Sequence, residues 1–224
     1  MSQDRLHPHV RGRGMASARS RTRLIEHLRS LQAAGEPVLA AMQATQRHLF
    51  VDEAMSSRAY DNTALPIGHG QTISQPFIVA HMTELLLDAG EPPQTVLEIG
   101  TGSGYQAAVL ARLVDSVYTV ECVPALYRLA KRRLARLQYR NIHVRPARED
   151  ALGLADYGPY DAILVAAGAE TLPVSLYPQL RDGGRLIVPV GPEGQQQLIV
   201  VDRHGDDFCR QELDTVSFVP LIAG

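Results

Sequence analysis

Apolar and polar positions follow two different periods along this chain, and the change between them outlines the fold. Apolar residues recur at helical spacing after residue 23 until Gly35 ends the run, and Pro37 opens a second short helix. A third helical pattern follows Pro76 and runs to Gly90. Between these helices, residues 61–76 carry prolines, glycines and hydroxyls without a lasting period. This segment predicts a structured loop that contains short strands at most.

From residue 95 onward, short apolar runs alternate with helical patterns. The expected strands are 95–99, 117–121, 142–145, 161–166 and 185–190, and the expected helices are 105–113, 124–137 and a shorter one near 172–180. This alternation predicts an α/β fold with a doubly wound, mostly parallel sheet and helices on both faces. Two late strands, 196–202 and 215–221, are expected after it, joined by a turn at 204–207.

We expect residues 21–224 to form one domain, because the chain shows no internal repeat and no second boundary. Residues 21–90 would supply the N-terminal helices and the loop, and residues 91–224 the sheet. Residues 1–23 hold six arginines and one acid, which leaves 16 basic and 23 acidic residues, a balance of −7, for the remainder. This composition predicts a disordered basic tail over residues 1–20. Met15 is an alternative start, with residues 1–14 as an extension.

Charge and composition narrow the class of protein. The acidic body argues against nucleic acid as the main substrate. No apolar run is long enough to span a membrane, and the N-terminus lacks the apolar segment of a secretory signal. Cys122 and Cys209 form no metal or redox spacing, and the histidines show no mutual metal spacing. We therefore expect a cytoplasmic monomer without a metal, a membrane contact or a nucleic-acid partner.

A glycine-rich turn over residues 96–106, Val-Leu-Glu-Ile-Gly-Thr-Gly-Ser-Gly-Tyr-Gln, carries the strongest chemical signal. Gly100, Gly102 and Gly104 allow a sharp change from strand to helix and let a ligand lie against bare backbone. From Gly102 the turn fits the dinucleotide fingerprint G-x-G-x-x-A. From Glu98 it also fits E-x-G-x-G-x-G, the pattern of S-adenosylmethionine (AdoMet) methyltransferases. A purely structural turn is the third interpretation.

Two acids favour AdoMet over a dinucleotide. A carboxylate at Glu98 would repel the two phosphates of a dinucleotide, whereas AdoMet carries a sulfonium and an ammonium group. Glu121 ends the next apolar run, where an acid accepts hydrogen bonds from ribose hydroxyls. Ligands of such sheets bind where the strands end, at the point where the strand order reverses. We expect Glu121, the glycine turn, residues 147–151 and residues 166–168 along that edge.

Several further segments make the chain similar to the protein-L-isoaspartate O-methyltransferase family. They are residues 64–68 (Ala-Leu-Pro-Ile-Gly), 70–76 (Gly-Gln-Thr-Ile-Ser-Gln-Pro), 82–86, 98–111, 179–191 and 218–221. The likeness extends from about residue 21 to the end. The loop at 70–76 is more specific than the glycine turn, because other methyltransferases have the turn without that loop.

The resemblance implies AdoMet-dependent methylation of the free carboxylate of L-isoaspartyl residues in damaged proteins and peptides. The methyl ester would then close to a succinimide, which starts repair. The resemblance also implies a Rossmann-like methyltransferase sheet and assigns Ser74 as the active-site residue. The expected cofactor-binding residues are Gln71, Thr72, Ile73, Glu98, Gly100, Gly102, Gly104 and Glu121, and the expected peptide-binding residues are Ile67, Val219 and Leu221.

Residues 147–151 depart from the family pattern. The family usually has Gly-Asp-Gly there, with the acid on the adenine amino group, and this chain has Ala-Arg-Glu-Asp-Ala. We expect Asp150 to make that contact, with Glu149 as the alternative. Two other functions stay open. The first alternative is a methyltransferase with another acceptor. The second is an AdoMet-binding protein whose turnover is weakened by this change.

Overall fold

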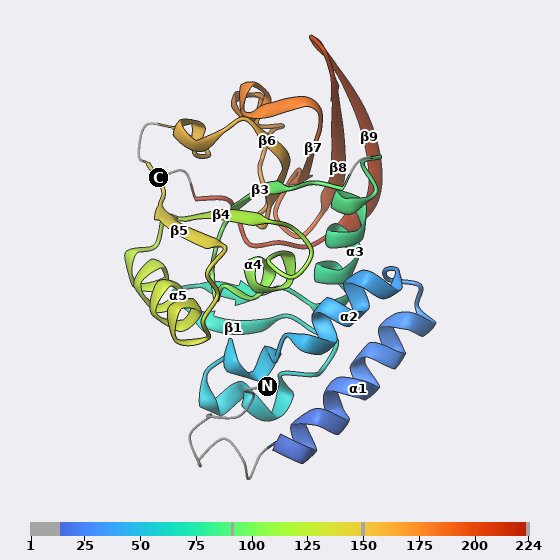
Figure 1. Cartoon of the computed structure of the whole chain (residues 1–224), viewed down its shortest axis with the longest axis vertical. Coiled ribbons are helices and arrows are strands. Elements are labelled where there is room, and N and C mark those ends of the chain that lie inside the picture. The colour runs from blue at the N-terminus through green and yellow to red at the C-terminus, as the bar shows by residue number, and fades with distance from the viewer. Residues whose placement is uncertain (1–13, 91, 149–150, 223–224) are drawn as a thin grey trace.

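A seven-stranded sheet forms the centre of the computed structural model, which describes residues 14–90, 92–148 and 151–222 (Figure 1). The strands are β3 (Thr95–Ile99), β4 (Ser116–Glu121), β5 (Ile142–Pro146), β6 (Tyr160–Val165), β7 (Leu180–Val190), β8 (Gln196–His204) and β9 (Asp207–Val216). Their order is β5-β4-β3-β6-β7-β8-β9, parallel through β7 and antiparallel for β8 and β9. The chain moves outward from β3 to β5 and then returns to β6. The strand order therefore reverses between β3 and β6, which is where such sheets bind ligands.

Five α-helices and several short 3-10 helices surround the described part of the sheet. The elements are α1 (Gly14–Ser30), α2 (Glu36–Ala44), α3 (Pro76–Leu87), α4 (Tyr105–Leu110), α5 (Pro124–Arg136), and the 3-10 helices η2 (Arg47–Leu49), η3 (Glu53–Arg58), η4 (Ala155–Tyr157) and η5 (Val174–Gln179). A proline opens or immediately follows the start of α2, α3 and α5, where its missing N–H is not needed. Within the described residues, no helix combines the length and apolarity needed to cross a lipid bilayer.

Both faces of the sheet are covered, as the sequence pattern predicts, but by different kinds of helix. On one face Val96 and Leu164 pack with apolar residues of α3 and α4, while α5 packs beside them on β4 and β5. On the other face Leu97 and Ile163 pack with Leu176 of η5. Because both faces are buried, the central parallel strands are largely apolar on both faces rather than alternating, with Glu98 and Thr119 as buried polar exceptions. This arrangement confirms the predicted doubly wound α/β fold.

Two predicted elements are wrong in their type or position. The helix expected near 172–180 is the 3-10 helix η5, because Pro178 lies inside it and cannot donate the hydrogen bond of an α-helix. The strand expected at 215–221 is instead β9, which ends at Val216. Most of β9 is exposed at the edge of the sheet, so its polar residues hide the strand from an apolar pattern. The chain beyond it returns to the sheet through hydrogen bonds between Gly168 and the backbone of Val219 and Leu221.

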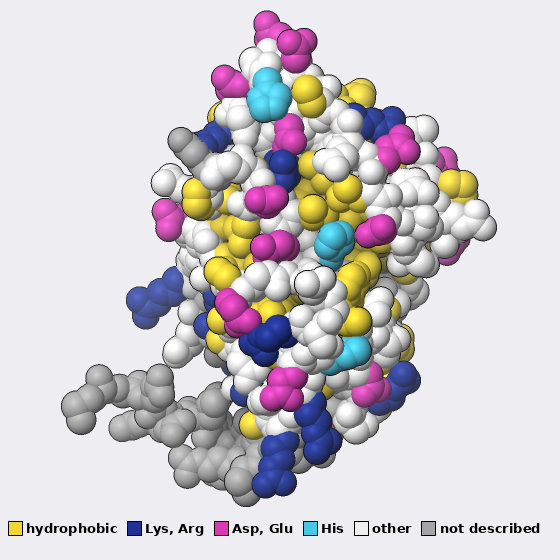
Figure 2. All heavy atoms as spheres, turned by 90° about the vertical axis from the view of Figure 1, so that its right-hand side faces the viewer, with side chains coloured by type: hydrophobic (Ala, Val, Ile, Leu, Met, Phe, Trp, Pro, Cys, Tyr) yellow, Lys and Arg dark blue, Asp and Glu magenta, His cyan; other side chains and the backbone are white. Residues whose placement is uncertain are grey.

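The basic N-terminal segment is partly helical. Helix α1 begins at Gly14, so residues 14–20 of the expected disordered tail are helical; residues 1–13 lie outside the described residues. The Ser17 hydroxyl anchors this turn, 3.0 Å from His48 Nδ1 and 3.3 Å from the Tyr60 hydroxyl. Arginine is a good helix former, and composition alone hides this contact. Figure 2 shows Lys and Arg side chains near α1 and acidic side chains over the exposed tip of the β8–β9 hairpin.

The segment that precedes α3 is a small hairpin. Strand β1 (Leu65–Gly68) pairs with β2 (Gln71–Ile73), as the loop interpretation allowed. The side chain of Asn62 then caps the turn into α3, because its Oδ1 accepts from Phe77 N at 3.0 Å. Gln75 Nε2 donates back to the Asn62 carbonyl at 3.0 Å. These bonds fix the loop that carries Ser74 against the rest of the molecule.

Asp161 aligns the two central strands. Its Oδ2 accepts from Gln94 N and from Thr95 N, each at 2.7 Å, and its Oδ1 pairs with Arg181 at 2.8 Å. These contacts tie the start of β3 to β6. These contacts give Asp161 a structural role.

The left-handed conformation at Gly104 yields a stability prediction. Gly104 has φ +86°, and an added Cβ would lie 3.2 Å from Leu134 Cδ1 of α5. Gly104→Ala combines the backbone strain of about 1–2 kcal/mol with this crowding. Gly194→Ala is the matched control, since Gly194 has φ +78° and open space around it. Urea unfolding should therefore show a greater loss of stability for Gly104→Ala, and equal losses would contradict the packing argument.

Candidate functional site

The glycine turn lies at the ends of β3 and β4, beside the reversal of strand order. Gly100 and Gly102 have φ +96° and +52°, in the left-handed region that favours glycine. The backbone N–H groups of Gly100 and Thr101 donate to the Val120 carbonyl at 3.0 and 3.1 Å. The turn is therefore fixed to β4, and its outer surface is bare backbone.

Glu121 holds the same turn from the end of β4. Its Oε2 accepts from Gly102 N at 2.7 Å, and its Oε1 accepts from Val123 N at 2.9 Å. The residue is buried, yet it lines the neighbouring cavity. A carboxylate accepts about four hydrogen bonds. Oε1 also accepts from Cys122 Sγ at 3.8 Å, so Oε2 is the oxygen that keeps capacity for a ligand hydroxyl.

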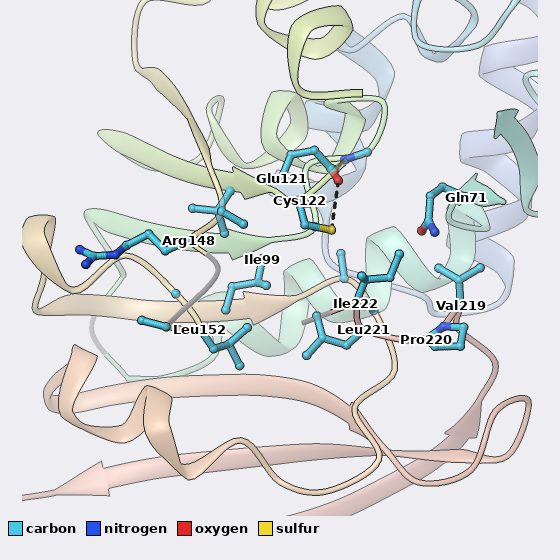
Figure 3. Close-up of a pocket in the computed structure, with 18 of the residues that line it drawn as sticks. Gln71, Ile99, Glu121, Cys122, Arg148, Leu152, Val219, Pro220, Leu221 and Ile222 are labelled. Carbon is cyan, nitrogen blue, oxygen red and sulfur yellow. Dashed lines mark hydrogen bonds between the residues drawn. The ribbon is translucent and has the colours of Figure 1, made fainter. Parts of the chain in front are cut away.

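A cavity of about 320 Å³ opens over this turn (Figure 3). Figure 3 shows Glu121 and Cys122 on one side of it and Leu221 and Ile222 on the other. Its remaining walls combine apolar side chains with few polar groups. They are formed by Gln71, Thr72, Ile99, Gly100, Gly102, Val120, Ala147, Arg148, Ala151, Leu152, Gly153, Ala166, Ala167, Val219 and Pro220. A cavity of this size and character is typical of a small-molecule site.

A second cavity, of about 430 Å³, adjoins the first. Ser74 lines this second cavity, and it does not line the first. Thr72, Ala166 and Val219 line both. These three residues come from β2, from the end of β6 and from the C-terminal segment. The site therefore has two adjoining compartments, one against the glycine turn and one against the Ser74 loop.

Glu98 lines neither the first nor the second cavity. It is fully buried, and its Oε2 accepts from Thr119 Oγ1 at 2.6 Å, which itself lies 2.6 Å from Thr101 Oγ1. Burial raises the pKa of Glu98 to about 8, so the carboxyl is mostly protonated at neutral pH. The electrostatic argument from a carboxylate at Glu98 therefore needs correction. Glu98 instead borders a small pocket of about 30 Å³ that Ser74 also lines.

The other predicted site residues divide into three groups. Gln71, Thr72, Gly100, Gly102, Glu121, Val219 and Leu221 come together around the first cavity. Ile73 borders only the small pocket, while Ile67 is buried beside Gly102 and Gly104 packs against Leu134. Glu149 and Asp150 lie outside the described residues, so their expected contact with adenine stays a prediction.

Sequence reasoning missed part of both cavities. Leu152, Gly153 and Ile222 line the first, and Thr215–Ser217 line the second. The apolar pattern placed them in a strand over 215–221, which gave no sign that they line a cavity; Thr215 and Val216 do lie in a strand, at the end of β9. Residues 147 and 166–167 were expected at this edge from their positions after strands, and they are there. No cluster of His, Cys, Asp or Glu suited to a metal ion occurs in the part of the chain that the structure describes.

Comparison with known proteins agrees with this geometry. The model of the family Protein-L-isoaspartate(D-aspartate) O-methyltransferase matches residues 19–224. Proteins named protein-L-isoaspartate O-methyltransferase from Pseudomonas aeruginosa and Halorhodospira halophila are 54% and 53% identical to the chain, over 94% and 95% of it and 99% and 96% of their own lengths. A Plasmodium falciparum structure described as this enzyme, in complex with S-adenosyl-L-homocysteine, is 25% identical, with a TM-score of 0.78 over 90% of this chain and 97% of that one.

The buried carboxyl of Glu98 predicts a pH-dependent stability. Its pKa is raised from 4.5 to about 8 in the folded state, so the folded protein holds the proton more tightly than the unfolded chain. The stabilisation is complete below about pH 4.5, and it falls by up to about 1.4 kcal/mol for each pH unit until about pH 8. Urea unfolding at pH 5 and pH 8 should show a larger loss for the wild type than for Glu98→Gln. Glu193→Gln, at an exposed turn, serves as the control. An equal loss in all three proteins would refute the assignment.

Proposed function

Because this chain belongs to the protein-L-isoaspartate(D-aspartate) O-methyltransferase family, we propose that it methylates the free carboxylate of L-isoaspartyl residues in damaged proteins and peptides, with AdoMet as methyl donor. The main observation in support is the junction of the two cavities at Thr72, Ala166 and Val219. A donor in one compartment and an acceptor in the other would meet there. The ester would then close to a succinimide without help from the protein.

The first cavity, which lies over the glycine turn, suits AdoMet. Gly100 and Gly102 offer backbone without a side chain in the way, and apolar Ile99 and Leu221 suit an adenine ring. Glu121, with capacity left on Oε2, is the acceptor for the ribose hydroxyls. AdoMet supplies a methyl group on positively charged sulfur, which makes the leaving group a neutral thioether. Asp150, or Glu149 in its place, is proposed to accept from the adenine amino group.

Ser74 is proposed to position the substrate. Its hydroxyl lines the second cavity and would donate a hydrogen bond to the isoaspartyl carboxylate. The acceptor oxygen is already an anion, so no residue has to remove a proton from it. Catalysis then depends on alignment and on exclusion of water from the carboxylate. Among the residues proposed for the peptide site, Val219 lines both cavities, Leu221 lines only the first, and Ile67 is buried beside Gly102.

The expectations about cellular context stay proposals. We propose a cytoplasmic monomer that acts on proteins and peptides rather than on nucleic acid or at a membrane. Cys122 and Cys209, both free, fit a reducing compartment. The acidic balance of residues 24–224 opposes a nucleic-acid substrate.

A pair of peptides tests the proposed activity. The chain should transfer a methyl group from AdoMet to a peptide that contains L-isoaspartate and leave its normal aspartyl twin unmodified. Release of labelled methyl ester measures the reaction. Methylation of both peptides, or of a small carboxylic acid alone, would favour a methyltransferase with another acceptor. Binding of S-adenosylhomocysteine without any turnover would favour the regulatory alternative.

Substitution of Ser74 tests its positioning role. Ser74→Ala should lower kcat about tenfold or more, equivalent to about 1.4 kcal/mol of barrier, because carboxylate alignment matters most in the transition state. Affinity for S-adenosylhomocysteine should stay the same, since Ser74 does not line the first cavity. Ser217→Ala removes another hydroxyl from the second cavity and should have a smaller effect. Unchanged kcat and KM in Ser74→Ala would leave Ser74 as a structural residue of the loop.

A further inference from the structure

Arg47 is a buried cation whose contacts serve neither cavity directly. It lies at the start of η2, and its side chain is completely shielded from solvent. Its Nη2 donates to the Ser74 carbonyl at 2.7 Å, while its Nε and Nη1 have no hydrogen bond. Within the described residues no carboxylate pairs with it. Burial lowers the pKa of Arg47 to about 10, which keeps the guanidinium charged at neutral pH. A buried charge with so few partners is costly, so a purely structural residue is a poor explanation.

The same guanidinium also contacts the start of α4. Its carbon lies 4.8 Å from the centroid of the Tyr105 ring. Tyr105 is buried and directly follows Gly104, the last glycine of the turn. Arg47 therefore joins two segments: it holds the backbone of Ser74 by a hydrogen bond and the end of the glycine turn by a cation–π contact.

Arg133 makes the corresponding contacts on the cofactor side. Its Nη1 donates to the Ser103 carbonyl, inside the glycine turn, at 2.7 Å. Its guanidinium carbon lies 6.0 Å from the Phe50 ring, and Phe50 meets Tyr105 edge to face with ring centroids 5.5 Å apart. The two rings thus connect the arginine that binds the Ser74 carbonyl with the arginine that binds the Ser103 carbonyl of the glycine turn.

We propose that Arg47 is a positioning residue for methyl transfer, which sets the place of Ser74 relative to the glycine turn. This inference rests on the proposed role of Ser74. A displacement of about 1 Å at the reacting groups lowers rates by about a hundredfold, so a fixed distance between the two segments has a direct kinetic value. Arginine suits the task because its planar group donates to a carbonyl while lying over a ring, which lysine does less well.

Steady-state kinetics with an isoaspartyl peptide test the inference. Arg47→Met should lower kcat about tenfold or more and leave the Kd for S-adenosylhomocysteine within about twofold of the wild type. Arg47→Lys should fall between the two and keeps the test informative if Arg47→Met folds poorly. Arg133→Met should raise the Kd for S-adenosylhomocysteine. Arg112→Met is the matched control, because Arg112 also binds a carbonyl, that of Ala44, and a ring, that of Tyr139, but contacts neither site segment.

A double variant separates positioning from general destabilisation. If Arg47 acts through Ser74, Arg47→Met combined with Ser74→Ala should be no more than about twofold slower than Ser74→Ala alone. Losses that multiply would overturn the inference. So would a normal kcat in Arg47→Met, or a loss of S-adenosylhomocysteine affinity in Arg47→Met as large as in Arg133→Met.

Amide hydrogen exchange supplies a readout without turnover. Residues 73–76 should exchange faster in Arg47→Met than in Arg112→Met, and residues 100–104 should exchange alike in both. Wild-type exchange over residues 73–76 in Arg47→Met would overturn the inference. Full turnover in Ser74→Ala would instead overturn the proposed role of Ser74, whatever the exchange data show. The two failures are therefore distinguishable.

Discussion

The attachment of the glycine turn to β4 is the constraint on which the site depends. Hydrogen bonds from Gly100 and Thr101 to the Val120 carbonyl fix the near side of the turn, and the Glu121 carboxylate fixes Gly102. Two adjacent strands therefore define where bare backbone meets the cavity. The parallel pairing of β3 with both β4 and β6 holds this point at the reversal of strand order. Without that pairing, neither the wall at Ala166 nor the acid at Glu121 would face the same space.

The Ser74 side of the second cavity comes from the N-terminal part of the chain, which packs against the seven-stranded sheet without adding a strand to it. Hairpin β1–β2 and the Ser74 loop follow α2 and precede α3 in the chain, and the buried Arg47 donates a hydrogen bond to the Ser74 carbonyl. A carbonyl held by a guanidinium is a short, directional contact. Such contacts transmit geometry between segments that share no strand pairing. The compartments proposed for donor and acceptor are thus built from different segments, which the contacts of Arg47 join.

The sequence predicted the sheet and the cofactor cavity well, because both depend on local patterns. Apolar runs placed β3 to β6, and the residue after each strand indicated the edge that binds the ligand. Edge strand β9 escaped detection because its exposed faces need no apolar residues, and the part of Thr215–Ser217 in the cavity lining was missed with it. The protonation of Glu98 and the contact of Arg47 with Ser74 could not be read from sequence, since burial and a separation of 27 residues decide them.

The wall that both cavities share at Thr72, Ala166 and Val219 has a consequence for how a polypeptide substrate can bind. Each compartment has lining residues that the other lacks. With AdoMet proposed in the first cavity and the substrate in the second, a long polypeptide only has to place one side chain at the shared wall. Access then depends on how easily the damaged stretch of the client can detach from its own fold. Isoaspartyl residues in loosely packed loops and termini would be methylated before those in buried segments. Selection among substrate proteins would then follow local order rather than the residues that flank the isoaspartate.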